Sequence, residues 1–384
     1  MKNVYIAADN IISSLGFTTC ENCSNIEKGI SGISKIEDAL LAPNIFFASL
    51  ADTGKLISNF KSIGNTDDFS RFEQMCVLSV KDALSQTDID LKSPKTLFIL
   101  STTKGNIDIL EKGVEKSNPP KALYLWDTAD KIGKYFNNPN PPVVVSNACI
   151  SGVMALIAGS RMIRSGQYEN VVVTGADIIS KFVVSGFQSF QSLSNGPCRP
   201  YDKSRDGLNL GEGCGTIILT GNRECAKQSN IIVGGGFTSN DANHISGPAR
   251  TGEGLFLSIQ KTMDDPLSAA AGEIDYISAH GTATPYNDEM EAIALSRAGL
   301  LDVPVNSYKG YWGHTLGAAG IIESVAAIYS LENDLLFQTA GFQELGVSEK
   351  INVIAENDKK PLKSCLKTAS GFGGCNASII FYKK

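Results

Sequence analysis

One cysteine stands at a position typical of a nucleophile. Cys149 follows the apolar run Val143–Ser146 and precedes a helix-forming stretch, Ile150–Arg164. A thiol at the start of a helix lies near free backbone N–H groups and the positive end of the helix dipole, which stabilise a thiolate and a developing oxyanion. The position therefore predicts a reactive thiol with a lowered pKa. The alternative is a buried structural cysteine, because cysteine is among the residues most often buried.

Two of the three histidines lie in glycine-rich turns next to predicted strands and helices. His280 comes directly after the strand Tyr276–Ala279, and His314 precedes the helix Ala318–Glu332. Imidazole donates and accepts protons near neutral pH, and side chains at the ends of such elements are good candidates for a site. We predict that both histidines act chemically, with two solvent-facing loop residues as the alternative. His244 lacks this context and is predicted to be structural.

Neither a metal centre nor a disulfide framework is predicted. Cys20 and Cys23 form a Cys-x-x-Cys pair, but the sequence has no second pair to complete a zinc site. The nine cysteines are an odd number, and no export signal accompanies them, which indicates reduced thiols. The glycine-rich segment Gly211–Gly215 precedes a strand rather than a helix, so it does not fit a phosphate-binding loop.

Apolar strands alternate with helices along the whole chain. This alternation predicts an α/β fold whose sheets are covered on both faces. The polar stretch Thr251–Gly272 is predicted to be a connection. The predicted strands are Val4–Ala8, Thr96–Leu100, Val143–Ser146, Val171–Thr174, Thr216–Leu219, Ile231–Gly234, Tyr276–Ala279, Val305–Ser307 and Ala377–Tyr382. The predicted helices are Asp68–Gln86, Ile150–Arg164, Glu289–Ala298 and Ala318–Glu332.

One unit of strand, tight turn and small-residue helix occurs twice. Val143–Cys149 leads into the helix that begins at Ser151, and Val303–Ser307 leads through a glycine-rich turn into Leu316–Gly320 and its helix. A duplicated fold with its active site between the halves would produce this arrangement. The polar segment Gly221–Asn230 is the natural junction. We therefore predict an N-terminal half, residues 1–228, that carries the nucleophile, and a C-terminal half, residues 229–384, that carries both histidines.

Composition limits the class of protein. The 384 residues are 42% hydrophobic and 19% charged, which favours a large folded core over disorder. The net charge of −6 argues against a broad nucleic-acid surface. No apolar run reaches the length of a membrane helix, and Met1–Asn10 resembles a strand more than a signal peptide. We expect a cytoplasmic protein that binds neither nucleic acid nor membrane.

Five groups of residues form motifs that follow one another over nearly the whole chain. They are Asn147-Ala148-Cys149; Arg199-Pro200-Tyr201-Asp202 with Arg205-Asp206-Gly207 and Gly211-Glu212-Gly213; Ala279-His280-Gly281-Thr282 with Asn287-Asp288 and Glu291; Lys309 with Gly313-His314-Thr315-Leu316-Gly317; and Gly371-Phe372-Gly373-Gly374 with Asn376. In this order they resemble the β-ketoacyl-[acyl-carrier-protein] synthases, the elongating condensing enzymes of the thiolase superfamily.

The resemblance implies a thiolase-like, duplicated five-layered α-β-α-β-α fold and a decarboxylative condensation. In this family a cysteine takes an acyl group from a carrier-protein thioester. Malonyl-carrier protein then loses carbon dioxide, and the resulting carbanion attacks the acyl-cysteine. Cys149 matches the nucleophile, and His280 and His314 match the two histidines of the decarboxylating site. The amides of Cys149 and Phe372 match the oxyanion hole, and Phe372 also matches a gating residue. No cofactor or metal is implied, because the substrates are carried on the phosphopantetheine of the carrier protein.

Further residues match supporting positions of the family. Lys309 and Glu323 match a buried lysine–glutamate pair that orients the site, although a loop lysine is more often solvated. Asp288 and Glu291 stand three residues apart at a helix start, where simple capping is the alternative. The substrate-binding positions implied by the resemblance are Ile150, Thr282, Thr284, Ser370, Gly371 and Gly373.

Some residues depart from the family pattern. Ile150 and Ser370 stand where the family commonly has a small residue and a phenylalanine, respectively. Tyr311 and Trp312 are larger than the usual neighbours of His314. Cys375 occupies a slot where threonine is frequent, and we predict that it is a small buried substitute. These departures leave the acyl chain open, but not the reaction.

The resemblance also implies an acyl carrier protein as partner and a homodimer joined through sheet edges. Because carrier proteins are acidic, a local basic patch is expected, with Lys203 and Arg205 as candidates. Two alternatives stay open. One is a specialised ketosynthase of a polyene or polyketide pathway that acts as a heterodimer with a homologous subunit. The other is a non-catalytic subunit of the chain-length-factor type, which retention of the cysteine and both histidines disfavours.

Overall fold

The main sheet of the protein has ten strands in two halves. The computed structural model describes residues 2–113, 119–227 and 230–384. The strands are β1 (Tyr5–Ile12), β4 (Thr96–Ser101), β5 (Val143–Val145), β6 (Asn170–Asp177), β8 (Gly213–Thr220), β9 (Ile231–Asn240), β10 (Tyr276–Ser278), β11 (Val305–Asn306), β14 (Ser364–Gly371) and β15 (Cys375–Lys383). Their order is β5-β4-β6-β8-β1 in one half and β9-β15-β14-β10-β11 in the other. The halves meet where Tyr5 of β1 pairs with Ile232 of β9.

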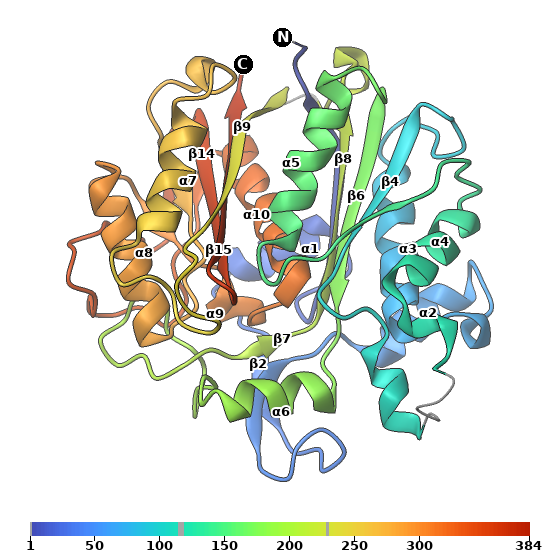
Figure 1. The fold of residues 1–384 in the computed structure, drawn as a ribbon, viewed down its shortest axis with the longest axis horizontal. Coiled ribbons are helices and arrows are strands. Elements are labelled where there is room, and N and C mark those ends of the chain that lie inside the picture. Colours follow the sequence, from blue (N-terminus) through green and yellow to red (C-terminus); the bar gives the residue numbers. More distant parts are fainter. Residues whose placement is uncertain (1, 114–118, 228–229) are drawn as a thin grey trace.

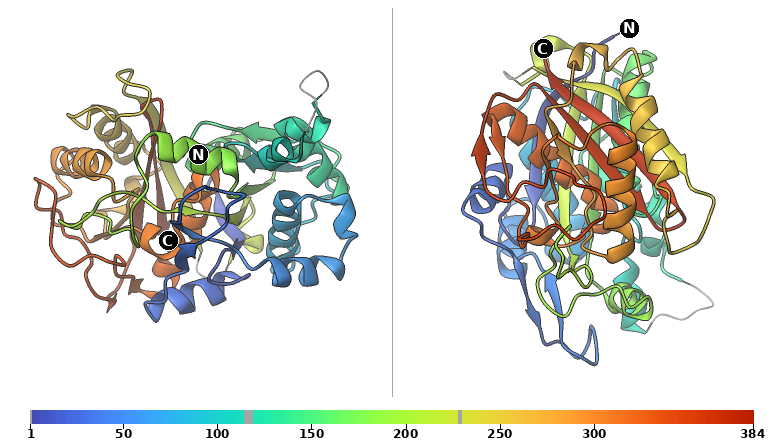
Figure 2. Two further views of the ribbon diagram at one scale, coloured as in Figure 1. Left: turned by 90° about the horizontal axis from the view of Figure 1, so that it is seen from below. Right: turned by 90° about the vertical axis from the view of Figure 1, so that its left-hand side faces the viewer.

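The helices form three layers, one between the sheet halves and one outside each (Figure 1). They are α1 (Thr19–Glu27), α2 (Thr53–Lys61), α3 (Arg71–Leu84), α4 (Leu125–Tyr135), α5 (Ser151–Arg164), α6 (Lys181–Ser189), α7 (Glu253–Met263), α8 (Pro285–Arg297), α9 (Lys309–Trp312) and α10 (Ala319–Asn333). α5 and α10 lie in the centre, α3 and α4 cover the first half, and α7 and α8 cover the second. Seen from below, the same succession of layers is visible in the left view of Figure 2. The predicted five-layered α-β-α-β-α fold is confirmed.

Burial explains the sequences of the central elements. β4 and β8 are buried along their whole length, which suits their nearly continuous apolar side chains. α10 lies between two sheets and has almost no solvent-facing residue, so it lacks the polar stripe of a surface helix. α3, on the outside, begins with a capping box in which Ser70 and Glu73 each accept a hydrogen bond from the other's backbone N–H.

The central helices cross with their backbones in contact near their N-terminal ends. A Cβ atom on Gly152 of α5 would lie 2.7 Å from the backbone nitrogen of Ile321, and a Cβ atom on Gly320 of α10 would lie 2.6 Å from that of Val153. Any larger residue at the crossing would force the helices apart. The crossing brings the start of α5, next to Cys149, against the start of α10.

All of the predicted elements are present in the structure. Each of the nine predicted strands and four predicted helices has a counterpart, and β14 is the strand of the main sheet that the prediction missed. The prediction also missed the short strands outside the main sheet and the helices α1, α2, α4, α6, α7 and α9. The prediction of a connection over Thr251–Gly272 is wrong. α7 occupies much of this segment because Leu255 and Ile259 are buried on one face that packs against β9 and β15. The predicted boundary between residues 228 and 229 lies outside the described residues and stays a prediction.

Both ends of the chain lie at the same end of the molecule (Figure 1). Two neighbouring residues of β9 pair with the strands that carry these ends: Ile232 pairs with Tyr5 of β1, and Ile231 pairs with Lys383 of β15. At the opposite end, β2 (Ile33–Ile36), β3 (Phe46–Ser49) and β7 (Leu210–Gly211) form a small sheet below the core. β12 (Leu335–Leu336) and β13 (Asp358–Lys359) form a separate pair. No helix in the described residues has both the length and the apolar character needed to cross a bilayer.

Candidate active site

Cys149 lies in a sharp turn between β5 and α5. Ala148 has a φ of +44°, a conformation that L-residues rarely adopt. Ser151 closes the turn, because its hydroxyl donates to the carbonyl of Ala148 at 2.6 Å and accepts from the backbone N–H of Asn147 at 2.8 Å. Strained residues held in place by their neighbours cluster at functional sites. The turn presents the thiol, which remains largely buried, at the beginning of a central helix.

His280 follows the end of β10 and is held through its backbone. Its N–H donates to Oε1 of Glu291 at 2.8 Å, and the N–H of Gly281 donates to Oε2 of the same residue at 2.7 Å. The ammonium group of Lys309 donates to the His280 carbonyl at 2.6 Å. These bonds fix the main chain at a point where Gly281 adopts a φ of +38°. The imidazole ring is therefore positioned by buried groups on two other helices.

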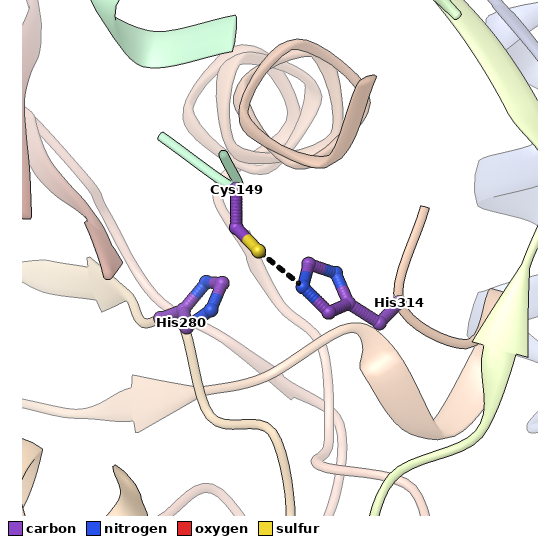
Figure 3. A group of neighbouring side chains, drawn as sticks. All are labelled: Cys149, His280 and His314. Atoms are coloured by element: carbon purple, nitrogen blue, oxygen red, sulfur yellow. Dashed lines mark hydrogen bonds between the residues drawn. The ribbon is translucent and has the colours of Figure 1, made fainter. Parts of the chain in front are cut away.

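His314 is held on the opposite side of the thiol. Its N–H donates to the carbonyl of Asn209 at 2.7 Å, and its carbonyl accepts from the N–H of Gly211 at 3.0 Å, so β7 holds it from both sides. Nε2 of His314 lies 3.0 Å from Sγ of Cys149 (Figure 3). The rings of His280 and His314 are nearly perpendicular, with centroids 5.2 Å apart. The structure thus brings together the three residues predicted to do chemistry.

Burial governs the protonation of this triad. It raises the pKa of Cys149 to about 12, against a smaller opposing effect of Lys309. Burial, followed by the charge of Lys309, holds the pKa values of His280 and His314 well below their usual range. At neutral pH the resting site therefore contains a thiol and two neutral imidazoles. The prediction of a lowered thiol pKa is wrong, because removal from water outweighs the helix end and nearby cations.

A backbone N–H group and an aromatic cluster complete the surroundings of the thiol. The N–H of Phe372, in the turn between β14 and β15, lies near the Cys149 sulfur and opposes the rise of its pKa. The Phe372 ring stacks on Phe187 at 5.6 Å and contacts Phe190 at 5.1 Å between ring centroids. Phe187 also meets the ring of His314 edge-on. Phe372 therefore places an amide near the sulfur and a ring against α6. Its roles in the oxyanion hole and as a gate stay predictions.

A buried ionic group lies behind His280. Lys309 forms an ion pair with Glu323 at 2.6 Å, as predicted, and its Nζ lies 3.3 Å from Nδ1 of His280. The other oxygen of Glu323 lies 2.7 Å from Nζ of Lys367, a fully buried residue of β14. The sequence reasoning missed Lys367, since a lone lysine between Leu366 and Thr368 gives no sign that it points inward.

Asp288 and Glu291 of α8 hold turns rather than cap their own helix. Oδ1 of Asp288 accepts from the N–H groups of Thr282 and Ala283 at 3.0 and 3.1 Å, and Oδ2 accepts from that of Tyr201 at 2.7 Å. Burial raises the pKa of Asp288 to about 6. Because Glu291 holds His280 in the same way, both carboxylates position the segment that follows β10.

The comparisons with known proteins agree with this geometry. The β-ketoacyl synthase N-terminal domain matches residues 1–224, and the β-ketoacyl synthase C-terminal domain matches residues 230–343. The chain belongs to the β-ketoacyl synthase family. It is 33% identical to 3-oxoacyl-[acyl-carrier-protein] synthase 2 of Vibrio cholerae over 72% of this chain and 71% of that protein. It is 27% identical to the enzyme of the same name from Vibrio harveyi over 100% of this chain and 99% of that protein.

The structural comparison gives the same fold. The ishigamide ketosynthase/chain length factor has a TM-score of 0.88 and 24% sequence identity, with 100% of this chain and 99% of that chain covered. Members of the β-ketoacyl synthase family are acyltransferase-type condensing enzymes, and this chain is one of them.

The structure places the predicted substrate positions of this β-ketoacyl synthase at or behind the triad. A Cβ atom on Gly371 would lie 2.9 Å from the nitrogen of Cys149, so glycine lets β14 approach the nucleophile. The hydroxyl of Ser370 donates to Asn376 at 2.7 Å. Thr282 and Thr284 share a hydrogen bond of 2.8 Å between their hydroxyls. Ile150 is fully buried in the core, and Gly373 has a φ of +81° in the turn after Phe372. Their contact with substrate stays a prediction.

Several residues singled out from the sequence lie away from the triad. Tyr311 and Trp312 are fully buried: Trp312 stacks on Tyr308 at 5.4 Å, and the Tyr311 hydroxyl donates to the carbonyl of Gln338. His244 is exposed, and its ring accepts hydrogen bonds within its own loop. Cys375 is buried as predicted, but it lies beside the turn that carries the nucleophile, with its Sγ 3.8 Å from the carbonyl oxygen of Asn147.

The two candidates for a basic patch differ in exposure. Arg205 is turned inward, where it donates to the carbonyl of Asp202 and pairs with Asp288 at 3.7 Å. It is wrong as a docking residue, because its side chain is only 8% exposed. Lys203 is exposed and pairs with Glu344 at 2.8 Å.

The triad also has the donor atoms of a metal site. The sulfur of Cys149 and one ring nitrogen from each of His280 and His314 all lie within 4.8 Å of one another. Thiolate and imidazole are ligands that zinc accepts. The prediction that the reaction needs no metal stays a prediction.

Proposed function

We propose that this β-ketoacyl synthase is a 3-oxoacyl-[acyl-carrier-protein] synthase that extends a cysteine-bound acyl group by two carbons from malonyl-carrier protein. The observation that carries the proposal is the position of the Cys149 sulfur, 3.0 Å from Nε2 of His314 and flanked by the perpendicular ring of His280 (Figure 3). A nucleophile with two imidazoles at one point serves both an acyl transfer and a decarboxylation.

The first half-reaction loads the acyl group. Sγ of Cys149 attacks the carbonyl carbon of the acyl thioester, and the bond between that carbon and the phosphopantetheine sulfur breaks. The thiol proton passes through Nε2 of His314 to the departing sulfur. Because burial raises the thiol pKa to about 12, the reaction begins from a thiol, and a base within hydrogen-bond distance is needed. The N–H groups of Cys149 and Phe372 stabilise the tetrahedral oxyanion.

The second half-reaction makes the new carbon–carbon bond. The bond between the malonyl carboxylate and its α-carbon breaks, carbon dioxide leaves, and the electron pair spreads onto the thioester oxygen. N–H groups of His280 and His314 stabilise this enolate, a role that neutral rings can fill. For this step the neutral His314 ring carries its proton on Nε2, the tautomer opposite to the one that accepts the thiol proton during loading. The α-carbon then attacks the acyl-cysteine carbonyl, the bond to Cys149 breaks, and the departing thiolate takes up a proton from water to regenerate the thiol. Lys309 holds His280 through its backbone carbonyl.

We further propose that the enzyme uses no cofactor beyond the phosphopantetheine of its carrier protein and works as a dimer in the cytoplasm. β5 is an edge strand of the main sheet, and its Val143 and Val144 are only half-buried. An unpaired edge strand is a template for a second copy or a homologous subunit. All nine cysteines are free thiols, which suits a reducing compartment. Fractionation of cells and the mass of the assembly in solution test these points.

A specialised ketosynthase paired with a homologous subunit is the second candidate. The similarity in fold to a ketosynthase/chain length factor keeps this alternative open. It predicts that the chain alone loads poorly and that a co-expressed homologue restores loading. Efficient extension of ordinary saturated acyl groups by the chain alone would reject it.

The intact mass of the protein after mixing with a panel of acyl-carrier proteins tests the proposal. We expect a mass increase in the wild type that disappears after malonyl-carrier protein is added. Cys149→Ala should abolish the increase, whereas Cys20→Ala, which removes an exposed thiol, should leave it unchanged. Loading that persists in Cys149→Ala, or acyl groups that malonyl-carrier protein does not remove, would reject the mechanism.

A further inference from the structure

A buried lysine on β14 contacts the segment that leads into His280. Lys367 is opposite Ser278 in the parallel pairing of β14 with β10. Its ammonium group donates to the carbonyls of Ser278 at 3.1 Å, Ala279 at 3.2 Å and Thr368 at 2.8 Å. Its side chain is fully buried. Two of these three carbonyl groups, those of Ser278 and Ala279, belong to the main chain immediately before a catalytic histidine.

Lys367 and Lys309 together bind three consecutive carbonyl groups. Lys309 donates to the carbonyl of His280, and Lys367 donates to those of the two preceding residues. Glu323 links the two lysines, with one oxygen 2.6 Å from Lys309 and the other 2.7 Å from Lys367. The ammonium, carboxylate and ammonium groups thus form one continuous chain behind the His280 turn.

The balance of charge shows why neither lysine acts alone. Burial lowers the pKa of Lys367, the carboxylates of Glu323 on α10 and Glu291 on α8 oppose this, and the charge of Lys309 adds to it. Without Lys367, Glu323 would have one partner and an unpaired oxygen, so its orientation toward Lys309 would loosen. Buried ion pairs are often replaceable by apolar residues without loss of stability, so stability alone is a weak reason for this arrangement.

We propose that Lys367 is a positioning residue for the decarboxylation half-reaction. It holds the 278–280 backbone and Glu323, and through them it aligns Lys309 and the His280 ring. This inference rests on the proposed function. The Lys367 contacts run to the main chain and to Glu323, and none of the bonds described above joins it to Cys149. Lys367 contributes less to the lowered pKa of His314 than burial, Lys309 and Lys104 do. The acyl-loading half-reaction, which depends on Cys149 and His314, should therefore change much less than the decarboxylation.

Single-turnover experiments on Lys367→Met separate the two half-reactions. Intact mass would follow first the loading of Cys149, then the loss of the acyl group after malonyl-carrier protein is added. We expect loading within about threefold of the wild type and acyl loss slowed by about tenfold to a hundredfold, since a small misplacement of a catalytic group has this effect. In steady state, kcat should fall while KM for malonyl-carrier protein changes by less than about threefold.

Lys227→Met is the matched control. Lys227 also bridges two carboxylates, Asp9 at 2.5 Å and Glu332 at 3.3 Å, but far from the triad in the fold. The Lys227→Met substitution should lower thermal stability without changing the ratio between the rates of the two half-reactions. Lys367→Gln, which keeps an N–H donor, should lie between the wild type and Lys367→Met.

Three outcomes would overturn the inference. The first is an equal fall in both half-reactions, and the second is no fall in either. The third is failure of both Lys367 variants to fold under conditions where Lys227→Met folds, which would make the role one of stability. A wild-type protein that neither loads nor releases an acyl group would instead reject the proposed function itself.

Discussion

The glycine crossing of the central helices gives the sharpest prediction from the structure. In Gly152→Ala the new methyl group would lie 2.7 Å from the backbone nitrogen of Ile321 and 3.0 Å from Cα of Gly320. Ordinary contact begins near 3.5 Å, so the helices must separate by about 0.8 Å at this point. Backbone atoms of a buried helix cannot move aside as a flexible side chain can. The strain should cost about 1–3 kcal/mol, which exceeds the helix propensity that alanine gains over glycine.

The same separation should act on the chemistry. Gly152 stands three residues after Cys149, whereas His314 precedes α10, so a shift between the helices lengthens the 3.0 Å contact between Sγ and Nε2. A displacement of this size carries the pair out of hydrogen-bond range, and we expect acyl loading to fall by about a hundredfold. The assay is the rate at which an acyl-carrier substrate adds mass to the protein, measured beside the thermal unfolding temperature.

Other helical glycines supply the controls. A Cβ atom on Gly133 of α4 would meet only Phe98, at 4.0 Å, so Gly133→Ala should raise the unfolding temperature and leave loading unchanged. Gly159 lies between these cases, with side-chain neighbours at 3.1 to 3.3 Å. We expect unfolding temperatures in the order Gly133→Ala, Gly159→Ala, Gly152→Ala, from highest to lowest. Wild-type loading and stability in Gly152→Ala would refute the reasoning.

Three further predictions follow from the triad. His280→Ala should leave acyl loading within a few-fold of the wild type but slow the loss of the acyl group by about a hundredfold to a thousandfold, because one enolate donor is removed; equal losses in both steps would contradict this. Alkylation of Cys149 by iodoacetamide should rise about tenfold per pH unit from pH 7 to 10, since the thiolate reacts and the thiol pKa is about 12; a plateau near pH 8 would contradict it. Chelators should leave turnover unchanged. Added zinc should inhibit the free enzyme more than the acyl-loaded enzyme, because acylation removes the Cys149 ligand. Inhibition by chelators would contradict the first expectation.

The sequence predicted the fold wherever burial imposes a simple pattern. Strands such as β4 and β8 are covered on both faces and contain the apolar runs Leu97–Leu100 and Ile217–Leu219, so they could be identified from composition. β14 escaped notice because it carries Lys367, Thr368 and Ser370 into the site, and its residues give neither an apolar run nor a clean alternation. A strand that supplies buried polar groups looks like a loop in the sequence.

The site shows a similar division. The position of Cys149 at a helix start and the turns that carry His280 and His314 led to three side chains that do meet in the structure. The direction of the thiol pKa could not be obtained in this way, because it depends on how much water the surrounding layers exclude. The role of Arg205 was equally out of reach, since only the fold shows that its guanidinium turns toward Asp288.

The arrangement of the chain ends has a practical consequence for tethered substrates. β15 runs from Cys375, beside the turn that carries the nucleophile, to Lys383 at the far end, an extended length of about 27 Å. A carrier domain fused to the C-terminus must return over at least this length to deliver its acyl group. A flexible glycine–serine tether has a comparable mean span at about 25 residues. Since the N-terminus lies at the same end of the molecule, attachment there does not shorten the path to the thiol. The length of the tether, rather than the choice of terminus, therefore decides whether a fused carrier can reach the thiol.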